Sequence, residues 1–243
     1  MKIVAVVQAR MGSTRLPGKV LKDLGGQTVL ARVISRVRRC ALLSEVVVAT
    51  STDSGDDIIL RVCRDLKIEA FRGSEQDVLD RYFHAAQHTK ADVVVRITSD
   101  CPLIDWEVTH HTIQQFLESY PDYASNALER TYPRGLDTEV MTASALERAW
   151  REACDPYQRA HVTPYLYQNP GVFRLLAVKN DVDYSLNRWT LDTLDDLKFL
   201  REIYSRFENR DDFSWRDVLA LTERDPTLAG INRHIVQKEL HEG

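Results

Sequence analysis

The segment with the richest potential for chemistry is residues 8–19, which follows a short apolar run at the start of the chain. It combines glycines, hydroxyl side chains and cations, namely Gly12, Gly18, Ser13, Thr14, Arg10, Arg15 and Lys19. Glycine permits a positive φ and a close backbone approach, so neighbouring N–H groups can point at one anion. The cations would neutralise much of the charge of a triphosphate. The segment therefore predicts a polyphosphate-binding loop, with merely solvated surface cations as the alternative.

The spacing of this loop separates it from the P-loop of ATPases. Five residues lie between Gly12 and Gly18, one more than that motif has, and Val20 follows Lys19 where the motif requires Ser or Thr to hold Mg²⁺. A P-loop ATPase is therefore not indicated. Any metal ion must be held by residues elsewhere in the chain.

Two carboxylates are candidates for that metal ion. Asp100 ends the apolar run at residues 93–99, and Asp192 ends the run at residues 187–191. Ligands of open α/β sheets bind beyond the carboxyl ends of the strands, so both carboxylates are expected beside the phosphate loop. Mg²⁺ prefers such hard oxygens together with the phosphates of a substrate. Two structural alternatives stay open, because Asp192 is also suited to cap a helix and Asp100 to sit in a turn.

The elements that must position these residues alternate along the first half of the chain. Short apolar runs rich in β-branched residues predict buried parallel strands, and stripes with helical period lie between them. The expected elements are strands at residues 3–7, 45–50 and 93–97, helices at 29–37 and 58–66, and a third helix that opens at Ser74 with Asp77 in a box-like cap. This order predicts an α/β fold in which a three-layer, doubly wound mixed sheet has helices on both faces.

The second half of the chain is less regular. Residues 122–141 are interpreted as strand and loop. The other expected elements are helices at residues 106–120, 142–152, 158–167, 194–207 and 215–223 and strands at 173–178 and 187–191. No internal repeat or long linker marks a domain boundary.

Composition and charge argue against several classes of protein. The net charge of −4 argues against a wide nucleic-acid or membrane-binding surface, which needs a basic face. The four cysteines form no C-x-x-C pair, and His84 and His88 lack the glutamate of a zinc protease motif. The apolar start is too short to span a membrane. We therefore expect a cytoplasmic protein that binds neither nucleic acid nor membrane.

Several motifs resemble one family. The segments at residues 9–19, 48–50, 100–104 and 191–197 are similar to the CMP-sugar synthetases, which include the acylneuraminate and 3-deoxy-manno-octulosonate cytidylyltransferases. The segments at residues 71–75, 130–140 and 161–165 resemble most closely the spore-coat polysaccharide biosynthesis cytidylyltransferase branch. The resemblance covers residues 1 to about 235. One departure is that Thr98-Ser99 and Cys101-Pro102 flank Asp100, where octulosonate enzymes have Gln-Gly and Glu-Pro.

The resemblance implies a fold, ligands and roles for individual residues. The fold would be a nucleotide-diphospho-sugar transferase (Rossmann-like) type, with residues 1–243 as one nucleotidyltransferase domain and 122–190 as a lobe for acceptor binding and homodimer formation. Mg²⁺ would be the cofactor and CTP the co-substrate. The implied nucleotide-binding residues are Ala9, Arg10, Gly12, Ser13, Arg15, Lys19 and Asp100, with Arg72 and Ser74 near base and ribose. Asp100 and Asp192 would hold the metal, and with Arg15 and Lys19 they form the catalytic set.

An acidic acceptor would need its own cation, and Arg134 between Pro133 and Gly135 is the candidate. Asp137 and Glu139 alternate along a predicted strand and could accept sugar hydroxyls, with a solvated hairpin as the alternative. His161 is a further candidate for acceptor binding.

The hypothesis is CMP transfer from CTP to the hydroxyl of an acidic sugar or similar small anion, for surface polysaccharide or glycoconjugate biosynthesis. A glycosyltransferase and a non-catalytic nucleotide-binding module are the alternatives. The first would normally carry an Asp-x-Asp pair, which the Asp100 segment lacks.

Overall fold

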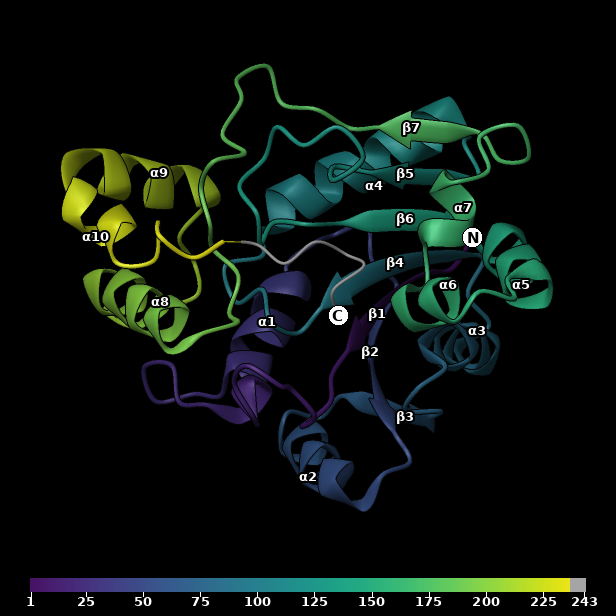
Figure 1. The fold of residues 1–243 in the computed structure, drawn as a ribbon, viewed down its shortest axis with the longest axis horizontal. Coiled ribbons are helices and arrows are strands. Elements are labelled where there is room, and N and C mark those ends of the chain that lie inside the picture. Colours follow the sequence, from purple (N-terminus) through teal and green to yellow (C-terminus); the bar gives the residue numbers. More distant parts are fainter. Residues whose placement is uncertain (237–243) are drawn as a thin grey trace.

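A seven-stranded mixed sheet forms the centre of the protein in the computed structural model, which describes residues 1–236. The strand order is β3-β2-β1-β4-β6-β5-β7. The strands are β1 (Ile3–Gln8), β2 (Glu45–Ser51), β3 (Glu69–Gly73), β4 (Val93–Thr98), β5 (Tyr123–Ser125), β6 (Glu139–Thr142) and β7 (Leu175–Ala177). Within the described residues β6 alone runs antiparallel to its neighbours. The predicted mixed, doubly wound sheet is therefore confirmed (Figure 1).

Helices cover both faces of this sheet (Figure 1). They are α1 (Val29–Val37), α2 (Asp57–Asp65), α3 (Val78–Thr89), α4 (Trp106–Ser119), α5 (Ala143–Glu152), α6 (Pro156–His161), α7 (Pro164–Tyr167), α8 (Leu194–Arg206), α9 (Trp215–Arg224) and α10 (Pro226–Gly230). Side chains of α1, α2 and α4 pack with one set of strand residues, and those of α3, α5 and α7 pack with the other. Successive strand residues point to opposite faces, so β1 supplies Ala5 and Val7 to one layer and Val4 and Val6 to the other.

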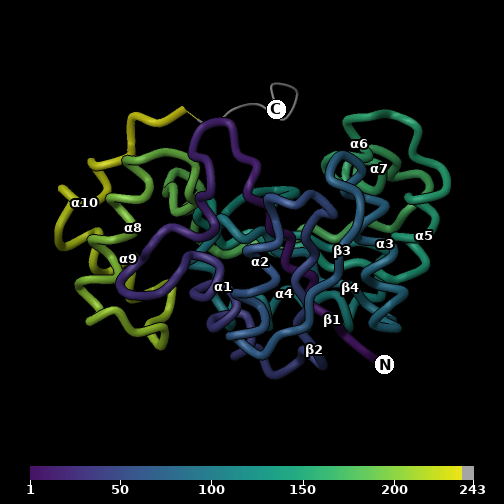
Figure 2. The backbone as a smooth tube through the Cα atoms, turned by 90° about the horizontal axis from the view of Figure 1, so that it is seen from below, coloured from purple at the N-terminus to yellow at the C-terminus, as the bar shows by residue number. Residues whose placement is uncertain are grey.

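A third apolar cluster lies beside the sheet. It joins α8, α9 and α10 to Leu16 of the phosphate loop and to Trp189 and Leu191 of the segment before α8. In Figure 2 the early, purple part of the chain rises as a loop next to these C-terminal helices. The packing therefore brings the loop after β1 and the chain near Asp192 to the same side of the molecule.

Most predicted elements are confirmed, and three expectations are wrong. Helix α3 begins at Val78, because Asp77 caps it by accepting a hydrogen bond from the Asp80 amide, so the helix does not open at Ser74. The helix expected at residues 158–167 is two short helices, because proline disfavours helical conformation in the residue before it and Pro164 begins α7. Residues 187–191 form no strand and make only one isolated bridge, from Arg188 to Arg134.

Some elements had no sequence prediction. These are strand β3 and helix α10, which were not predicted because they are short and their sequences show little hydrophobic periodicity. The segment 122–190, expected as a lobe, contributes β5, β6 and β7 to the same sheet.

Candidate functional site

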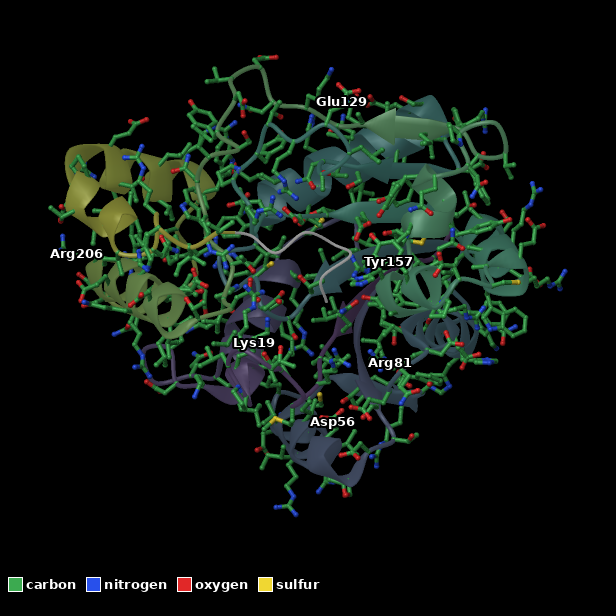
Figure 3. All side chains as sticks on the ribbon, in the orientation of Figure 1. Lys19, Asp56, Arg81, Glu129, Tyr157 and Arg206 are labelled. Atoms are coloured by element: carbon green, nitrogen blue, oxygen red, sulfur yellow. The ribbon has the colours of Figure 1, made fainter. Side chains whose placement is uncertain are left out.

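A cavity of about 600 Å³ opens at the carboxyl ends of β1 and β4. Its walls include the phosphate loop, the start of α3, the end of β4, the end of α6 and Asp192. Lys19 and Arg81, labelled in Figure 3, stand on either side of the end of β1. The expected site residues that line it are Ala9, Arg10, Gly12, Ser13, Arg15, Lys19, Asp100, His161 and Asp192.

The phosphate loop closes on itself through its backbone. Gly18 has φ +65°, and its amide donates to the Met11 carbonyl at 3.1 Å. The Met11 amide in turn donates to Oδ1 of Asp56 at 2.7 Å. The expected positive φ is therefore confirmed at Gly18. It is wrong at Gly12, where φ is not positive and an added Cβ would make only ordinary contacts, the nearest at 3.6 Å.

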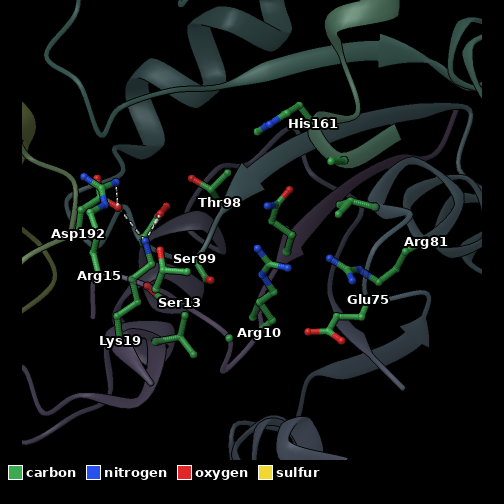
Figure 4. Close-up of a pocket in the computed structure, with 18 of the residues that line it drawn as sticks. Arg10, Ser13, Arg15, Lys19, Glu75, Arg81, Thr98, Ser99, His161 and Asp192 are labelled. Atoms are coloured by element: carbon green, nitrogen blue, oxygen red, sulfur yellow. Dashed lines mark hydrogen bonds and ion pairs between the residues drawn. The ribbon is translucent and has the colours of Figure 1, made fainter. Parts of the chain in front are cut away.

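The Lys19 ammonium joins the loop to both predicted metal ligands. Its Nζ donates to Oδ2 of Asp100 at 2.6 Å. It also donates to Oδ1 of Asp192 at 3.0 Å, and Figure 4 shows the Lys19 and Asp192 side chains side by side. It also donates to the Leu191 carbonyl at 3.0 Å. Arg15 approaches the same oxygen of Asp192 at 3.0 Å. The cationic loop and the two aspartates, distant in sequence, therefore meet at one point.

Charge pairing fixes the protonation of this cluster. Burial acts to raise the pKa of Asp100, but the ammonium of Lys19 more than offsets this and lowers the pKa to about 2. Burial likewise acts to lower the pKa of Lys19, and Asp100 and Asp192 together raise it well above its usual range. Both groups are therefore fully charged at neutral pH.

Asp192 is not the cap of α8, so that alternative is wrong. Thr193 occupies the N-cap position, and its side chain and that of Asp196 form a reciprocal capping box. Asp192 lies one residue earlier, and its second oxygen accepts from Nη2 of Arg188 at 2.9 Å. Cations therefore hold the Asp192 carboxylate at the cavity wall, and it does not cap the start of α8.

The two aspartates fit a divalent cation in part. Their carboxylates already share one positive group, the Lys19 ammonium, so the space between them favours positive charge. Within residues 1–236, no group of three or more His, Cys, Asp or Glu side chains forms a metal cluster. Mg²⁺ at this place would therefore draw its remaining ligands from water and from a phosphate substrate, which is its usual behaviour.

Arg72 and Ser74, expected near base and ribose, do not line the cavity. Arg72 donates to the carbonyls of Ser51 and Asp53 and pairs with Asp57, so it ties down the loop after β2. The Ser74 hydroxyl accepts from the Asp77 amide at the start of α3. Both side chains therefore make structural contacts within the protein and do not face the cavity.

Sequence reasoning missed Glu75, Arg81 and Arg96, which do line the cavity. Arg81 is 1% exposed and donates to the Ser74 carbonyl at 2.6 Å. A Cβ on Gly73 would lie 2.9 Å from Cγ of Arg81, so the strand end needs glycine there. The sequence feature that could have identified Arg81 is its position on the otherwise apolar face of α3, where a charged residue is unexpected.

Among the acceptor candidates, Arg134 is half-buried, and its side chain makes no hydrogen bond or ion pair within the described part of the chain. Burial and the neighbouring Arg130 guanidinium lower its pKa. Asp137 binds Arg130 through both carboxylate oxygens. Neither Arg134 nor Asp137 lines the cavity, so of the acceptor candidates only His161 does. The Arg134 guanidinium, outside that lining, is nevertheless available for an anion.

Glu139 is 8% exposed and does not line the cavity, which corrects the expectation that it faces an acceptor. Its carboxylate accepts from Tyr123, Thr163 and Arg96. Asp137 also precedes β6, so the two acids do not alternate on one strand.

Comparison with known proteins agrees with this geometry. A sequence model of the cytidylyltransferase family matches residues 4–212. The chain belongs to the cytidylyltransferase family. The chain is 37% identical to an uncharacterised protein of Methanocaldococcus jannaschii over 100% of this chain and 99% of that protein. It is 34% identical to the spore coat polysaccharide biosynthesis protein SpsF of Bacillus subtilis, over 93% of this chain and 96% of SpsF.

One partial sequence match and two solved structures also resemble the chain. The 3-deoxy-manno-octulosonate cytidylyltransferase of Trichlorobacter lovleyi is 37% identical over 48% of this chain and 46% of its own length. A solved cytidylyltransferase from Leptospira borgpetersenii superposes with a TM-score of 0.91 at 33% identity, over 98% of this chain and 100% of that chain. A CMP:2-keto-3-deoxy-manno-octonic acid synthetase complexed with CTP shares the fold, with a TM-score of 0.66 at 19% identity, over 85% of this chain and 100% of that chain.

Within residues 1–236, the protein has no helix with the length and apolar character that crossing a bilayer would need.

Proposed function

We propose that this member of the cytidylyltransferase family transfers CMP from CTP to the hydroxyl group of a small acidic sugar or a similar anionic acceptor, with release of pyrophosphate. The observation that carries the proposal is the contact of Lys19 with both Asp100 and Asp192 beside the phosphate loop. A polyphosphate needs concentrated positive charge, and Mg²⁺ is usually bound through one or two carboxylates together with the phosphates of its substrate. Both are present at one end of the cavity.

The triphosphate is assigned to the loop side of the cavity. Arg10, Arg15 and Lys19 supply cations there, and Ser13 adds a hydroxyl donor. Asp100 and Asp192 would hold Mg²⁺, which when bound neutralises phosphate charge and orients the α-phosphate. Because Asp100 is ionised far below neutral pH, it acts as a fixed negative charge and does not donate a proton.

The reaction is an in-line displacement at the α-phosphorus. The acceptor oxygen forms a bond to phosphorus, the bond from phosphorus to the bridging oxygen of the β-phosphate breaks, and the hydroxyl proton passes to solvent. Negative charge accumulates on the departing pyrophosphate. Arg15 and Lys19 are placed to stabilise it, so the protein contributes mainly orientation and electrostatics.

An acidic acceptor is supported by Arg134. Its guanidinium is half-buried and, within residues 1–236, unpaired, and it is surrounded by the charged neighbours Arg130, Asp137 and Arg188. A carboxylate would complete a charge-assisted pair with such a group. The names of two relatives, a spore coat polysaccharide biosynthesis protein and an octulosonate cytidylyltransferase, are compatible with a sugar acid and a role in polysaccharide or glycoconjugate synthesis.

The experiment crosses the four ribonucleoside triphosphates, each with Mg²⁺, with a panel of sugar acids and their neutral analogues, and measures pyrophosphate release and product mass. We expect release only with CTP and an acidic sugar, and a product that carries CMP. Transfer of an intact sugar from a nucleotide sugar, without pyrophosphate release, would indicate the glycosyltransferase alternative. CTP binding without turnover of any acceptor would favour the binding-module alternative.

A further inference from the structure

The turn that joins α6 to α7 has an unusual backbone. Val162 has φ +75° and ψ −60°, and its side chain is 0% exposed. The Thr163 amide donates to the His161 carbonyl at 2.9 Å, which closes a three-residue γ-turn. This conformation is strained, and more so for a β-branched residue at positive φ. Such a turn persists only where surrounding contacts hold it.

One of those contacts is made by the Thr163 hydroxyl. Thr163 occupies the N-cap position of α7, where a hydroxyl ordinarily accepts from a helix amide, yet its side chain makes no cap bond. Instead Oγ1 donates to Oε1 of Glu139 at 2.6 Å. Thr163 is 3% exposed, so this is an internal bond. The turn is thereby fastened to the start of β6.

Glu139 is itself held on its other sides. The Tyr123 hydroxyl on β5 donates to the same oxygen at 2.5 Å, and the Arg96 guanidinium on β4 pairs with the second oxygen. Burial and the Glu139 charge raise the pKa of Tyr123 well above its usual range, so its hydroxyl stays protonated as a donor. A buried carboxylate with this many partners is fixed in place.

The residue that the turn presents is His161. It lines the cavity, and Figure 4 shows its ring pointing into the cavity from the α6 end. Its ring also packs against Tyr157, with centroids 4.7 Å apart. We infer that Glu139 is a positioning residue: through the Thr163 hydroxyl it holds the γ-turn at Val162 and so fixes His161 against the acceptor in the cavity. The part that concerns the acceptor rests on the proposed function.

The test uses two variants that each remove one hydroxyl from the same carboxylate oxygen. Thr163→Val deletes the bond that reaches the turn, whereas Tyr123→Phe deletes a bond that does not. Replacement of Glu139 itself is avoided, because it would leave Arg96 buried without its carboxylate. The first readout is the ring-proton NMR signal of His161 in the ligand-free protein, assigned by its loss in His161→Ala. The chain has seven histidines, which keeps the spectrum simple.

The Tyr157 ring shifts the His161 signal according to their relative position. We expect Thr163→Val to move this signal. Tyr123→Phe should leave it in place, because Arg96 still holds Glu139 and the Thr163 hydroxyl still joins it to the turn. No movement in Thr163→Val, or equal movement in both variants, would overturn the inference.

The second readout is kinetic. We expect Thr163→Val to raise the KM for the acceptor about fivefold, with little change in the KM for CTP, and to have no further effect in a His161→Ala background. An additive effect in the double variant would contradict positioning through His161. If the NMR signal moves but no acceptor is turned over, the proposed function fails while the positioning role of Glu139 stands.

Discussion

At the residue scale, the charge balance of the site depends on Lys19. Its ammonium lies between two carboxylates, Asp100 and Asp192, that are far apart in the sequence. Sequence reasoning found these three residues because each carries a local signal: a glycine-rich cationic loop, or an acid at the end of an apolar run. It missed Arg81 and Arg96, whose approach to the cavity depends on how α3 and β4 pack.

We predict that Lys19→Ala and Asp192→Asn each abolish measurable pyrophosphate release from CTP, a loss of at least about a thousandfold. The reason is that each removes a charge on which phosphate or metal binding depends. Matched controls are Lys22→Ala and Asp195→Asn, which change neighbouring residues outside the cavity lining. Circular dichroism checks the fold. Full activity in a folded Lys19→Ala or Asp192→Asn protein would refute the assignment.

Arg134→Ala should raise the KM for the acceptor by about tenfold or more, because a charge-assisted contact is lost. The KM for CTP should change far less. Arg151→Ala, on the exposed surface of α5, serves as the control. Equal effects of Arg134→Ala on both substrates would instead indicate a structural role.

The depressed pKa of Asp100 predicts a pH dependence of stability. The unfolded carboxyl titrates at about 3.9, whereas the folded one titrates at about 2, so its pairing stabilises the protein above about pH 4 and is lost as pH falls toward 2. The difference in unfolding free energy between wild type and Asp100→Asn should therefore be greatest above pH 4 and should shrink on acidification. Urea denaturation at several pH values measures it, and a difference that grows on acidification would contradict the pairing.

At the element scale, the turn at Gly135 shows why the acceptor side was harder to predict. Its φ is +109°, and an added Cβ would lie 2.7 Å from the Trp189 carbonyl carbon. The Pro-Arg-Gly sequence indicated a turn, but not its contact with residues 187–190. That contact replaces the strand expected there with a single bridge to Arg134. The expectation that Glu139 faces an acceptor was wrong for a similar reason, because its burial depends on contacts from β4, β5 and the start of α7 together.

We predict that Gly135→Ala destabilises the protein by about 2–4 kcal/mol and raises the KM for the acceptor by displacing Arg134. The matched control is Gly26→Ala, where φ is +84° but an added Cβ meets nothing within 4 Å. That variant shares the cost of positive φ without the collision, so it should lose about 1 kcal/mol. Thermal or urea unfolding compares the two, and equal losses would argue against the steric account.

At the scale of the whole molecule, the alternation of strands and helices was enough to predict the sheet and its two helical layers. The third apolar cluster was not foreseen, because it joins Leu16 near the start of the chain to α8 and α9 near its end. This cluster brings Asp192 to the phosphate loop.

Homodimer formation through residues 122–190 stays a prediction. The exposed side chains of Val182 and Leu186 in that segment support it, and light scattering would measure the oligomeric state.

The most direct test of the central claim is a crystal structure with CTP and Mn²⁺, whose anomalous signal locates the metal. We expect the triphosphate to contact residues 10–19 and the metal to be coordinated by both Asp100 and Asp192, with Lys19 against phosphate oxygens. A triphosphate bound away from this loop, or a metal ion that neither aspartate coordinates, would contradict the account.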